Sequence, residues 1–535
     1  MDISRHNLDI VKEYHQQTKH HYHRYANALG FMDWNSQPDP FRRFLGTELI
    51  SLPLQEKDHT PLYKDIFIPE KVPAQLLNKS TLAHFLESSL AISAWKKYVD
   101  AQWALRINPS SGNLHPTEGY IILPKLDGVN SLPGVYHYAP KEHALEKRAE
   151  CSDESWNFSK DIFFVGLTSI NWREVWKYGE RGFRYCQHDC GHAYMALDIA
   201  AKTLGWQIVL LNNISDDQLS KMLGLNRIED FVDEEKESPE LLAMVVTNPH
   251  HESSISITDD FIKSVISGHW YGQTNRLSRD HHHWEIIDQV DVACQKPETN
   301  FSQEKLKHNS LENVYKKDFT AYQVIKKRRS AVDMDGQTTM TKEQFYQMLL
   351  RVADDFDGVP WDAKIHLCLF VHRVVGLPPG LYILVRNKMS QKRLHDSMDQ
   401  NFKWEKPREC PASLNLFLLV EGDFISISKA ISCGQDIAGD GAFSLGMIAD
   451  FAQALEEHGA WFYKRLFWET GMVGQLLYLE AEAIGISATG IGCFFDDPMH
   501  ELLGLRDNQF QSLYHFTVGG ALVDDRLTTL PAYSS

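Results

Sequence analysis

The chain has 535 residues, of which 43% are apolar and 11% aromatic, and it carries a formal net charge of −17. This length predicts two or three domains with large cores, and the acidic balance argues against a nucleic-acid partner, because phosphate backbones select basic surfaces. The N-terminus has no apolar signal-peptide core, no apolar run is long enough for a membrane span, and the eight cysteines are scattered, so we expect a soluble cytoplasmic protein.

The first half of the chain begins with an aromatic, proline-rich lead-in, residues 1–80, which has little periodicity. We expect this segment to be extended and partly helical. Residues 82–95 are predicted to form a helix, and residues 161–170 have the continuous apolar character of a buried strand. Shorter strands are predicted over residues 135–138 and 241–247.

A long helix is predicted before the strand at 241–247. Apolar residues recur there at helical spacing, and Gly205 follows them at the position of a terminating glycine. These apolar residues are Ala193, Ala196, Leu197, Ala200, Ala201 and Leu204. Residues 251–318 are polar and irregular, which predicts a connecting segment between domains, and its tryptophans favour packing against the rest of the protein.

The second half repeats the alternation of helix and strand signals. A helix is predicted over residues 342–352. The other expected elements are strands over residues 365–374 and 414–421 and helices over residues 444–457 and 470–484.

A loop over residues 106–120, RINPSSGNLHPTEGY, is the strongest candidate for a ligand site. It places small and polar residues between two prolines and then enters a β-prone run, which predicts a rigid loop that feeds a strand. Ser110, Ser111, Gly112 and Asn113 supply hydroxyls, an amide and unhindered backbone N–H groups, which suit a polar ring system or an anion. A tight turn without a ligand explains the same composition, so both interpretations stay open.

The two halves are related in sequence. CGHAYMALDIAAKTLGW from Cys190 aligns with TGMVGQLLYLEAEAIGI from Thr470, which matches Gly191 to Gly471. MLGL at residue 222 aligns with LLGL at residue 502 at the same offset of 280 residues. An internal duplication predicts two domains of one fold, paired face to face as the subunits of a homodimer would be.

Several other motifs do not support a familiar site. Cys186, His188, Cys190 and His192 have ligand chemistry, but on a helix the two cysteines and the two histidines point about 200° apart and cannot converge on one zinc ion. The histidines at 281–283 are typical of a solvated loop, so we expect no metal site. Gly490-Ile491-Gly492 lacks the third glycine of a dinucleotide fingerprint, and the chain has neither a P-loop lysine nor a nucleophile elbow.

Several segments, in the same order, resemble the nitroreductase superfamily. In the first half they are PSSGNLHPTE, LPGVYHYAPKEHALEK and RYCQHDCGHAYMALDIAAKTLGW; in the second they are KRRSAVDMDGQTTMTKEQF, LPPGLY, ETGMVGQLLYLEAEAIGISATGIGCF and LLGL. Within the superfamily the chain resembles the thiazole/oxazole dehydrogenases of peptide maturation, the SagB/ThcOx type. The resemblance implies an α+β fold of two fused domains, residues 81–250 and 319–535, each with a central sheet flanked by helices, forming an intramolecular pseudo-dimer.

The resemblance also implies FMN at the interface of the two domains. In the family an RRS element holds the phosphate and ribityl chain, a backbone stretch with glycines lies near the flavin edge, and a basic residue near the C-terminus completes the phosphate site. The matching residues here are Arg328, Arg329 and Ser330, Gly490 and Gly492, and Arg526. Cations and hydroxyl donors suit a phosphate, although such a charge run on its own is typical of a solvated face.

The chain departs from the family pattern two positions after the serine of RRS, where Val332 replaces a basic residue. We expect phosphate binding either to be weaker or to be completed by Arg106 or Arg526. The azoline dehydrogenases are thought to use a lysine–tyrosine pair as acid and base, and Lys177 and Tyr178 are the matching candidates. A surface lysine beside a packing tyrosine is the simpler interpretation of this pair.

We therefore expect an FMN-dependent oxidoreductase that acts on a small-molecule or peptide substrate, either as a SagB/ThcOx-like dehydrogenase or as a nitro or quinone reductase with NAD(P)H as donor. A flavin-binding scaffold or partner subunit without turnover is the alternative. The first half keeps the PSS-x-N loop but lacks RRS, and the second half keeps RRS but has VPWDAKIHLCLF in place of the loop. This pattern predicts one flavin site per chain, shared between the halves; independent loss of both loops is the other explanation.

Overall fold

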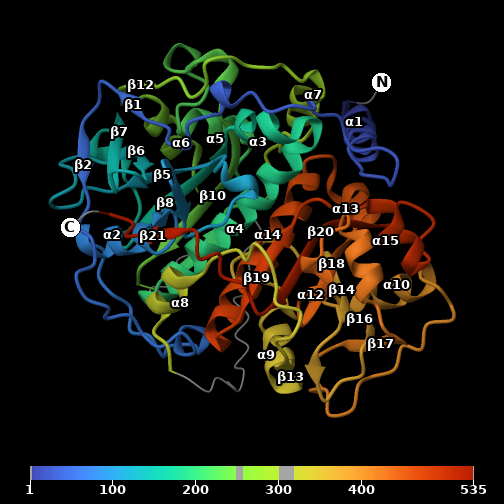
Figure 1. Cartoon of the computed structure of the whole chain (residues 1–535). Helices are drawn as coiled ribbons and strands as arrows, with labels where there is room; N and C mark the ends of the chain where they lie inside the picture. Colours follow the sequence, from blue (N-terminus) through green and yellow to red (C-terminus); the bar gives the residue numbers. More distant parts are fainter. Residues whose placement is uncertain (1–2, 249–256, 301–317, 534–535) are drawn as a thin grey trace.

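Two antiparallel sheets, each flanked by helices, follow one another along the chain in the computed structural model, which describes residues 3–248, 257–300 and 318–533 (Figure 1). Parts of the predicted connecting segment, residues 249–256 and 301–317, lie outside the described residues. Figure 1 shows the first sheet with its helices in blue to green and the second in orange to red. The expected α+β fold of two tandem domains is confirmed.

The first sheet has the strand order β11-β7-β6-β5-β8-β10-β9, and β2 also pairs with β7. Its strands are β2 (Leu49–Ser51), β5 (Thr117–Leu123), β6 (Gly134–Ala139), β7 (Ala144–Glu150), β8 (Ile162–Ser169), β9 (Gln207–Leu210), β10 (Ser238–Val246) and β11 (His269–Trp270). Every residue of the central strands β5 and β8 is buried. The continuous apolar run at residues 161–170 thus forms the buried strand that its composition predicts.

The second sheet repeats this topology in the order β17-β16-β14-β18-β20-β19. Its strands are β14 (Ile365–Val371), β16 (Gly380–Leu384), β17 (Leu416–Glu421), β18 (Phe443–Asp450), β19 (Ser487–Ile491) and β20 (Phe510–Gly519). Strand β14 takes the place of β5, β18 that of β8, and β19 that of β9. The predicted duplication is therefore visible strand by strand.

Two long buried helices, α4 (Gly182–Thr203) and α14 (Phe462–Ile484), pack against each other between the sheets. They cross at the glycines that the repeat matches. A methyl group on Gly191 would lie 2.1 Å from the Trp468 carbonyl oxygen, and one on Gly471 would lie 2.2 Å from the His188 carbonyl oxygen. Only glycine permits so close an approach, and the contact is reciprocal, as expected for two related halves.

Two predicted helices are partly wrong. The helix expected over residues 82–95 is α2 (Lys79–Glu87), and Ile92 begins strand β3 (Ile92–Tyr98), because the residues after Ser88 pair with two other strands. The helix expected over residues 444–457 is divided into strand β18 and helix α13 (Phe451–His458). A short, fully buried apolar run fits a central strand as well as a helix, so periodicity alone does not separate them.

The lead-in and the C-terminus tie the halves together. Helix α1 (Ile3–Gln17) contacts both, since Tyr14 donates to the Glu180 carbonyl at 2.7 Å and the His15 ring lies 3.1 Å from the Tyr463 hydroxyl. At the other end of the chain, β21 (Thr528–Leu530) pairs with β3 and so returns to the first half, where Figure 1 places the C-terminus.

The remaining elements complete the layers around the sheets. They are β1 (Phe44–Leu45), β4 (Ala101–Arg106), α3 (Asn171–Tyr178), α5 (Asp216–Met222), α6 (Asp259–Ile266), β12 (Gln273–Thr274), α7 (Glu285–Ala293), α8 (Ala321–Lys327), β13 (Met340–Thr341), α9 (Lys342–Val352), β15 (Val374–Val375), α10 (Gln391–Ser397), α11 (Ile425–Ile431), α12 (Ile437–Asp440) and α15 (Asp496–Leu503). Within the described residues, no helix is both long and apolar enough to cross a membrane.

Candidate functional site

The predicted ligand loop connects β4 to β5 through a short 3-10 turn, Ser111–Asn113. Gly112 has a φ of +59° and Asn113 a φ of +60°, a left-handed conformation that glycine and asparagine tolerate best. The Asn113 amide donates to the Ala104 carbonyl at 2.9 Å and its oxygen lies 3.0 Å from the His115 ring. These bonds make the loop rigid, as the sequence predicts.

A buried carboxylate on α4 anchors the loop. Asp189 accepts from the backbone N–H of Ser111 at 3.1 Å and from its hydroxyl at 3.0 Å. Its side chain is 2% exposed, and this burial raises the pKa of Asp189 to about 7. No local sequence pattern marks Asp189, although the repeat offers a signal: the matching residue on α14 is Glu469, which accepts from the backbone N–H of Ile365 at the start of β14.

The raised pKa of Asp189 gives a prediction for Asp189→Asn. Between its ordinary pKa of 3.8 and about 7, the folded chain keeps a proton that the unfolded chain releases, so the wild type loses stability as the pH rises through this window. The variant cannot ionise at this position and does not lose stability in this way. We expect the difference in free energy of unfolding between the variant and the wild type to change by about 3 kcal/mol, in favour of the variant, from pH 5 to pH 8. Urea unfolding at both pH values measures this. The control is the same substitution at the exposed acid Asp217. If the free energy of unfolding depends on pH in the same way for Asp189→Asn and the wild type, the raised pKa of Asp189 is contradicted.

The predicted acid–base pair lies directly against the loop. A methyl group on Gly112 would be 2.6 Å from the Tyr178 hydroxyl and 3.1 Å from the Lys177 ammonium. Both residues end helix α3 and are partly buried. Burial, with Glu174 adding to it, raises the pKa of Tyr178 well above its usual value. The phenol therefore keeps its proton at neutral pH and, of the two roles expected for the pair, is suited to that of the acid.

The basic run of the second half reaches this loop from the other side. The Arg328 guanidinium donates to the Arg106 carbonyl at 2.9 Å and to the Ile107 carbonyl at 3.1 Å. It is buried, and its Nη1 atom has no hydrogen-bond partner among the described residues. Desolvation lowers the pKa of Arg328 to about 10, so the group stays charged. Arg329 is half-buried beside it, and Ser330 is exposed.

Tyr478 on α14 links this basic run to the glycine edge. Its hydroxyl lies 2.9 Å from the Ser330 hydroxyl and accepts from the Gly490 N–H at 2.9 Å, and the Arg328 guanidinium lies over its ring at 5.1 Å. Tyr478 was not predicted from the sequence, because an aromatic residue on a buried helix face is usually part of the core.

The two predicted glycines lie where side chains leave no space. A methyl group on Gly490 would be 1.8 Å from the Tyr514 hydroxyl, and one on Gly492 would be 2.5 Å from the Tyr185 ring. The Tyr185 hydroxyl donates to the Gly492 carbonyl at 3.1 Å, and the Tyr185 and Tyr178 rings are 4.5 Å apart. Tyr185 on α4 thus joins the glycine edge of the second half to the acid–base pair of the first.

Two predicted phosphate ligands are placed differently. The Arg106 carbonyl meets Arg328, but the buried Arg106 guanidinium donates to the Pro40 and Thr117 carbonyls inside the first half. The Arg526 side chain is 74% exposed, and its described side-chain contacts are with Asp524, 2.8 Å away. The structure does not bring either guanidinium to the other predicted residues.

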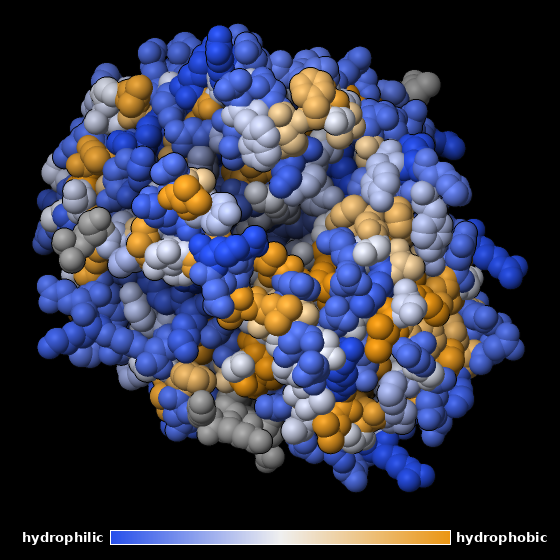
Figure 2. Space-filling model, in the orientation of Figure 1, coloured by the Kyte–Doolittle hydropathy of each residue, from blue (hydrophilic) through white to orange (hydrophobic). Residues whose placement is uncertain are grey.

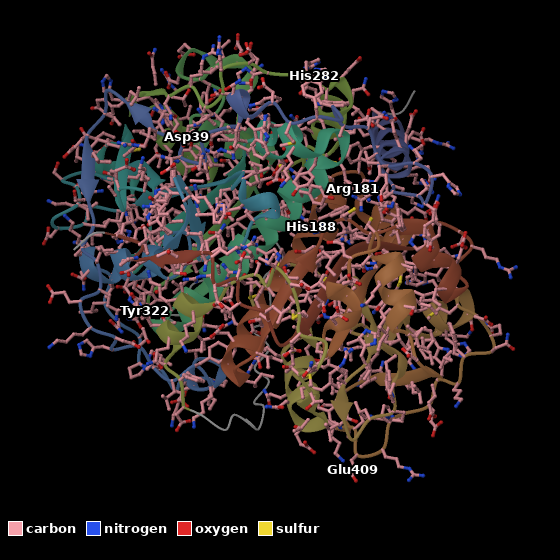
Figure 3. The ribbon with its side chains drawn as sticks, viewed as in Figure 1. Asp39, Arg181, His188, His282, Tyr322 and Glu409 are labelled. Atoms are coloured by element: carbon pink, nitrogen blue, oxygen red, sulfur yellow. The ribbon has the colours of Figure 1, made fainter. Side chains whose placement is uncertain are left out.

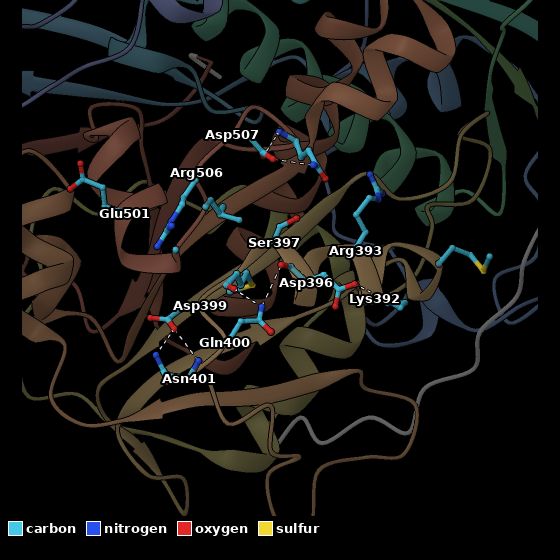
Figure 4. A pocket seen from close by; sticks show the side chains of 15 residues that line it. Lys392, Arg393, Asp396, Ser397, Asp399, Gln400, Asn401, Glu501, Arg506 and Asp507 are labelled. Carbon is cyan, nitrogen blue, oxygen red and sulfur yellow. Dashed lines mark hydrogen bonds and ion pairs between the residues drawn. The ribbon is translucent and has the colours of Figure 1, made fainter.

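The site lies on the boundary between the two halves. Figure 2 shows a hollow near the centre of this face, and Figure 3 labels His188 of α4 at the same place in the view. His188 stacks on the Tyr514 ring at 4.1 Å and bonds to the Thr470 hydroxyl at 2.8 Å. A separate hollow of about 1270 Å³ lies in the second half, between α10 and the end of α15 (Figure 4). Charged pairs such as Lys392 with Asp396 line it, and none of the predicted site residues does.

The symmetry-related position in the molecule is closed. At the offset of 280 residues, Leu210 and Asn212 replace the two glycines, and Arg465 replaces Tyr185. Asn212 accepts from Arg465 at 2.9 Å, and the Gly358 carbonyl, which precedes β14, accepts from the Leu210 N–H at 2.8 Å. The symmetry-related position therefore lacks the glycine pair and is filled by these side chains and backbone.

Comparison with known proteins identifies the family. The model described as "Nitroreductase family" matches residues 67–233 and 387–520, which is more than half of the chain. The chain belongs to the nitroreductase family. Proteins of the nitroreductase family generally bind flavin, which supports an oxidoreductase of flavin type in general for this chain.

Two proteins illustrate the likeness. "Putative nitroreductase MJ1384" of Methanocaldococcus jannaschii is 27% identical over 124 residues, which cover 22% of this chain and 62% of that protein. The chain thus spans less than two thirds of the length of this curated relative. A crystal structure of a "putative nitroreductase" from Anabaena variabilis covers 96% of this chain and 99% of its own, with a TM-score of 0.69 and 19% identity. At that identity the likeness concerns the fold.

Proposed function

We propose that the chain is an FMN-dependent oxidoreductase with one FMN held between its two halves, which act as an intramolecular pseudo-dimer. The observation that carries the proposal is the pair of hydrogen bonds from Arg328 to the Arg106 and Ile107 carbonyls. They join the basic run of the second half to the ligand loop of the first. When bound, FMN supplies a two-electron hydride carrier at its N5 atom.

The residues present fit such a cofactor. Arg328 holds a buried charge whose Nη1 atom has no hydrogen-bond partner among the described residues, and Arg329 and the Ser330 hydroxyl stand beside it, a set suited to a phosphate. The rigid Ser110–Asn113 loop would border the ring system on one side and the Gly490–Gly492 backbone on the other. Charge-assisted bonds to the phosphate would satisfy the unpaired Arg328 N–H, whose burial otherwise costs free energy.

The Lys177–Tyr178 pair would transfer the proton that accompanies hydride transfer. Tyr178 keeps its proton because burial raises its pKa, and the Lys177 ammonium lies 5.2 Å from its ring centroid. We propose that Tyr178 donates this proton to the substrate and that Lys177 orients the substrate and stabilises negative charge on it. A protonated Tyr178 suits the reduction of a nitro or quinone compound with NAD(P)H as donor, because that reaction consumes a proton. Oxidation of a small molecule or peptide of the SagB/ThcOx kind releases a proton, and for that substrate class the Lys177–Tyr178 pair would have to accept it.

A spectroscopic experiment tests the proposal. The purified full chain, incubated with FMN or FAD and desalted, should retain FMN and show the yellow flavin spectrum, while FAD should bind more weakly because no dinucleotide fingerprint is present. Anaerobic NAD(P)H should bleach the bound flavin, and an added quinone should restore the colour. Protein that stays colourless after incubation with FMN would contradict the proposal, and bound FMN that no donor or substrate reduces would favour the scaffold alternative.

A further inference from the structure

Two cysteines from distant parts of the second half meet beside the glycine edge. The Sγ atoms of Cys433 and Cys493 lie 2.7 Å apart. Cys433 stands in the turn between α11 and α12, and Cys493 directly follows Gly492. Both thiols are partly exposed, as is Cys410, whereas the other five cysteines are buried. The pair is therefore both in mutual contact and accessible to small molecules.

Two hydrogen bonds that do not involve the sulfurs hold the Cys433 and Cys493 segments together. The Gln435 side-chain amide donates to the Cys493 carbonyl at 2.9 Å, and the Phe495 N–H donates to the Ile431 carbonyl at 2.7 Å. Cys433 adopts a left-handed φ of +56°, which is uncommon for a residue with a side chain and persists only where neighbours fix it. The thiols are thus positioned in advance, and a bond between them requires little backbone movement.

The two thiols are electrostatically different. The contact between the two sulfurs, together with the nearby Arg181 guanidinium, lowers the pKa of Cys493, whereas the contact and burial raise the pKa of Cys433. Tyr25 adjoins Cys433, and Tyr178, Tyr185 and the Asp496 carboxylate face Cys493. Asp496 forms an ion pair with Arg181 at 3.0 Å. The Arg181 guanidinium also donates to the Gly492 carbonyl at 3.4 Å, so a cation lies directly beside Cys493. We therefore assign Cys493 as the nucleophile and Cys433 as the resolving thiol.

We propose that Cys433 and Cys493 form a redox-active dithiol that reduces low-molecular-weight disulfides. The Cys493 thiolate attacks one sulfur of the small disulfide, forms a mixed disulfide and releases the first small thiol. Cys433 then loses its proton and attacks the Cys493 sulfur, which forms the Cys433–Cys493 bond and releases the second small thiol. Two protein thiols are oxidised, the small disulfide is reduced, and the two cysteine protons end on the released thiols.

This inference does not depend on flavin binding, and it assigns a chemical role to a pair that the flavin site leaves unused. The full chain, reduced and then treated with oxidised glutathione, is alkylated and digested for peptide mass spectrometry. We expect two alkylatable thiols to be lost, a peptide that links Cys433 to Cys493, and recovery of both thiols with dithiothreitol.

Single serine variants separate the roles. In Cys433→Ser, Cys493 should retain glutathione as a stable mixed disulfide, because no resolving thiol remains, and in Cys493→Ser the linked peptide should be absent. Cys410→Ser is the matched control, since Cys410 is also partly exposed, and it should leave the linkage intact. Glutathione on Cys410 of the wild type without any link between Cys433 and Cys493 would overturn the proposal, as would a link that involves Cys410 instead.

Discussion

Arg329→Glu should weaken FMN binding by about 100-fold or more. The half-buried Arg329 stands beside the unpaired Arg328 N–H, where a phosphate would bind, and a hydrogen bond to a charged group is worth about 1.5–3 kcal/mol. The variant removes one such bond and adds a negative charge, so a loss of about 3 kcal/mol or more follows, which corresponds to about two orders of magnitude in affinity. Flavin fluorescence during titration measures the dissociation constant.

The neighbouring Lys327 provides the control for this experiment. Its side chain is exposed and its ammonium lies over the Phe319 ring, so Lys327→Glu makes the same change of charge outside the site. We expect this variant to bind FMN nearly as the wild type does. Ser111→Trp, in the other half, should abolish binding by filling the loop. Unchanged affinity in Arg329→Glu would show that the basic run does not hold the phosphate.

Tyr178→Phe should slow substrate turnover by about 100-fold to 10,000-fold while the flavin content stays unchanged. Proton donation by a positioned side chain typically contributes this much to the rate, and Tyr178 contacts the loop through Gly112 without taking part in the basic run. Lys177→Ala should have an effect of the same kind. Steady-state kinetics with a donor and acceptor identified by flavin bleaching measure the change.

A second tyrosine controls for the loss of a hydroxyl. Tyr382 in the second half donates to the Pro378 carbonyl at 2.7 Å, so Tyr382→Phe also loses a hydrogen bond but should retain the wild-type rate. If Tyr178→Phe and Lys177→Ala turn over a confirmed substrate as fast as the wild type, the pair is structural, as a packing tyrosine beside a surface lysine would be.

Much of the fold can be predicted from patterns contained within short stretches of the sequence. Helix α9 coincides with its predicted range, and the offset of 280 residues brings Gly191 and Gly471 to one helix crossing. The predictions fail where burial overrides periodicity. The run at 444–450 is buried on both faces because β18 is a central strand, so it carries no regular alternation of apolar and polar residues that would distinguish it from a helix.

The candidate site was predictable where a short segment carries the chemistry. The loop at 110–113 and the run at 328–330 are each contiguous, and the structure brings both to the same boundary. Asp189 and Tyr478 could not be predicted as site residues, because their roles depend on contacts across 78 and 148 residues of sequence. A buried acid or aromatic residue on a helix has no local signal for such a contact, although Glu469 at the repeat position was an available clue for Asp189.

The stoichiometry of FMN binding tests most directly whether the chain holds one flavin site shared between its halves. The symmetry-related position is closed by Leu210, Asn212 and the Gly358 carbonyl, whereas Gly490 and Gly492 let the Tyr514 and Tyr185 side chains approach the backbone of the other edge. Titration of the full chain with FMN, followed by flavin fluorescence and checked by isothermal calorimetry, should saturate at one FMN per 535-residue chain. Saturation at two FMN per chain, or the absence of binding, would contradict this account.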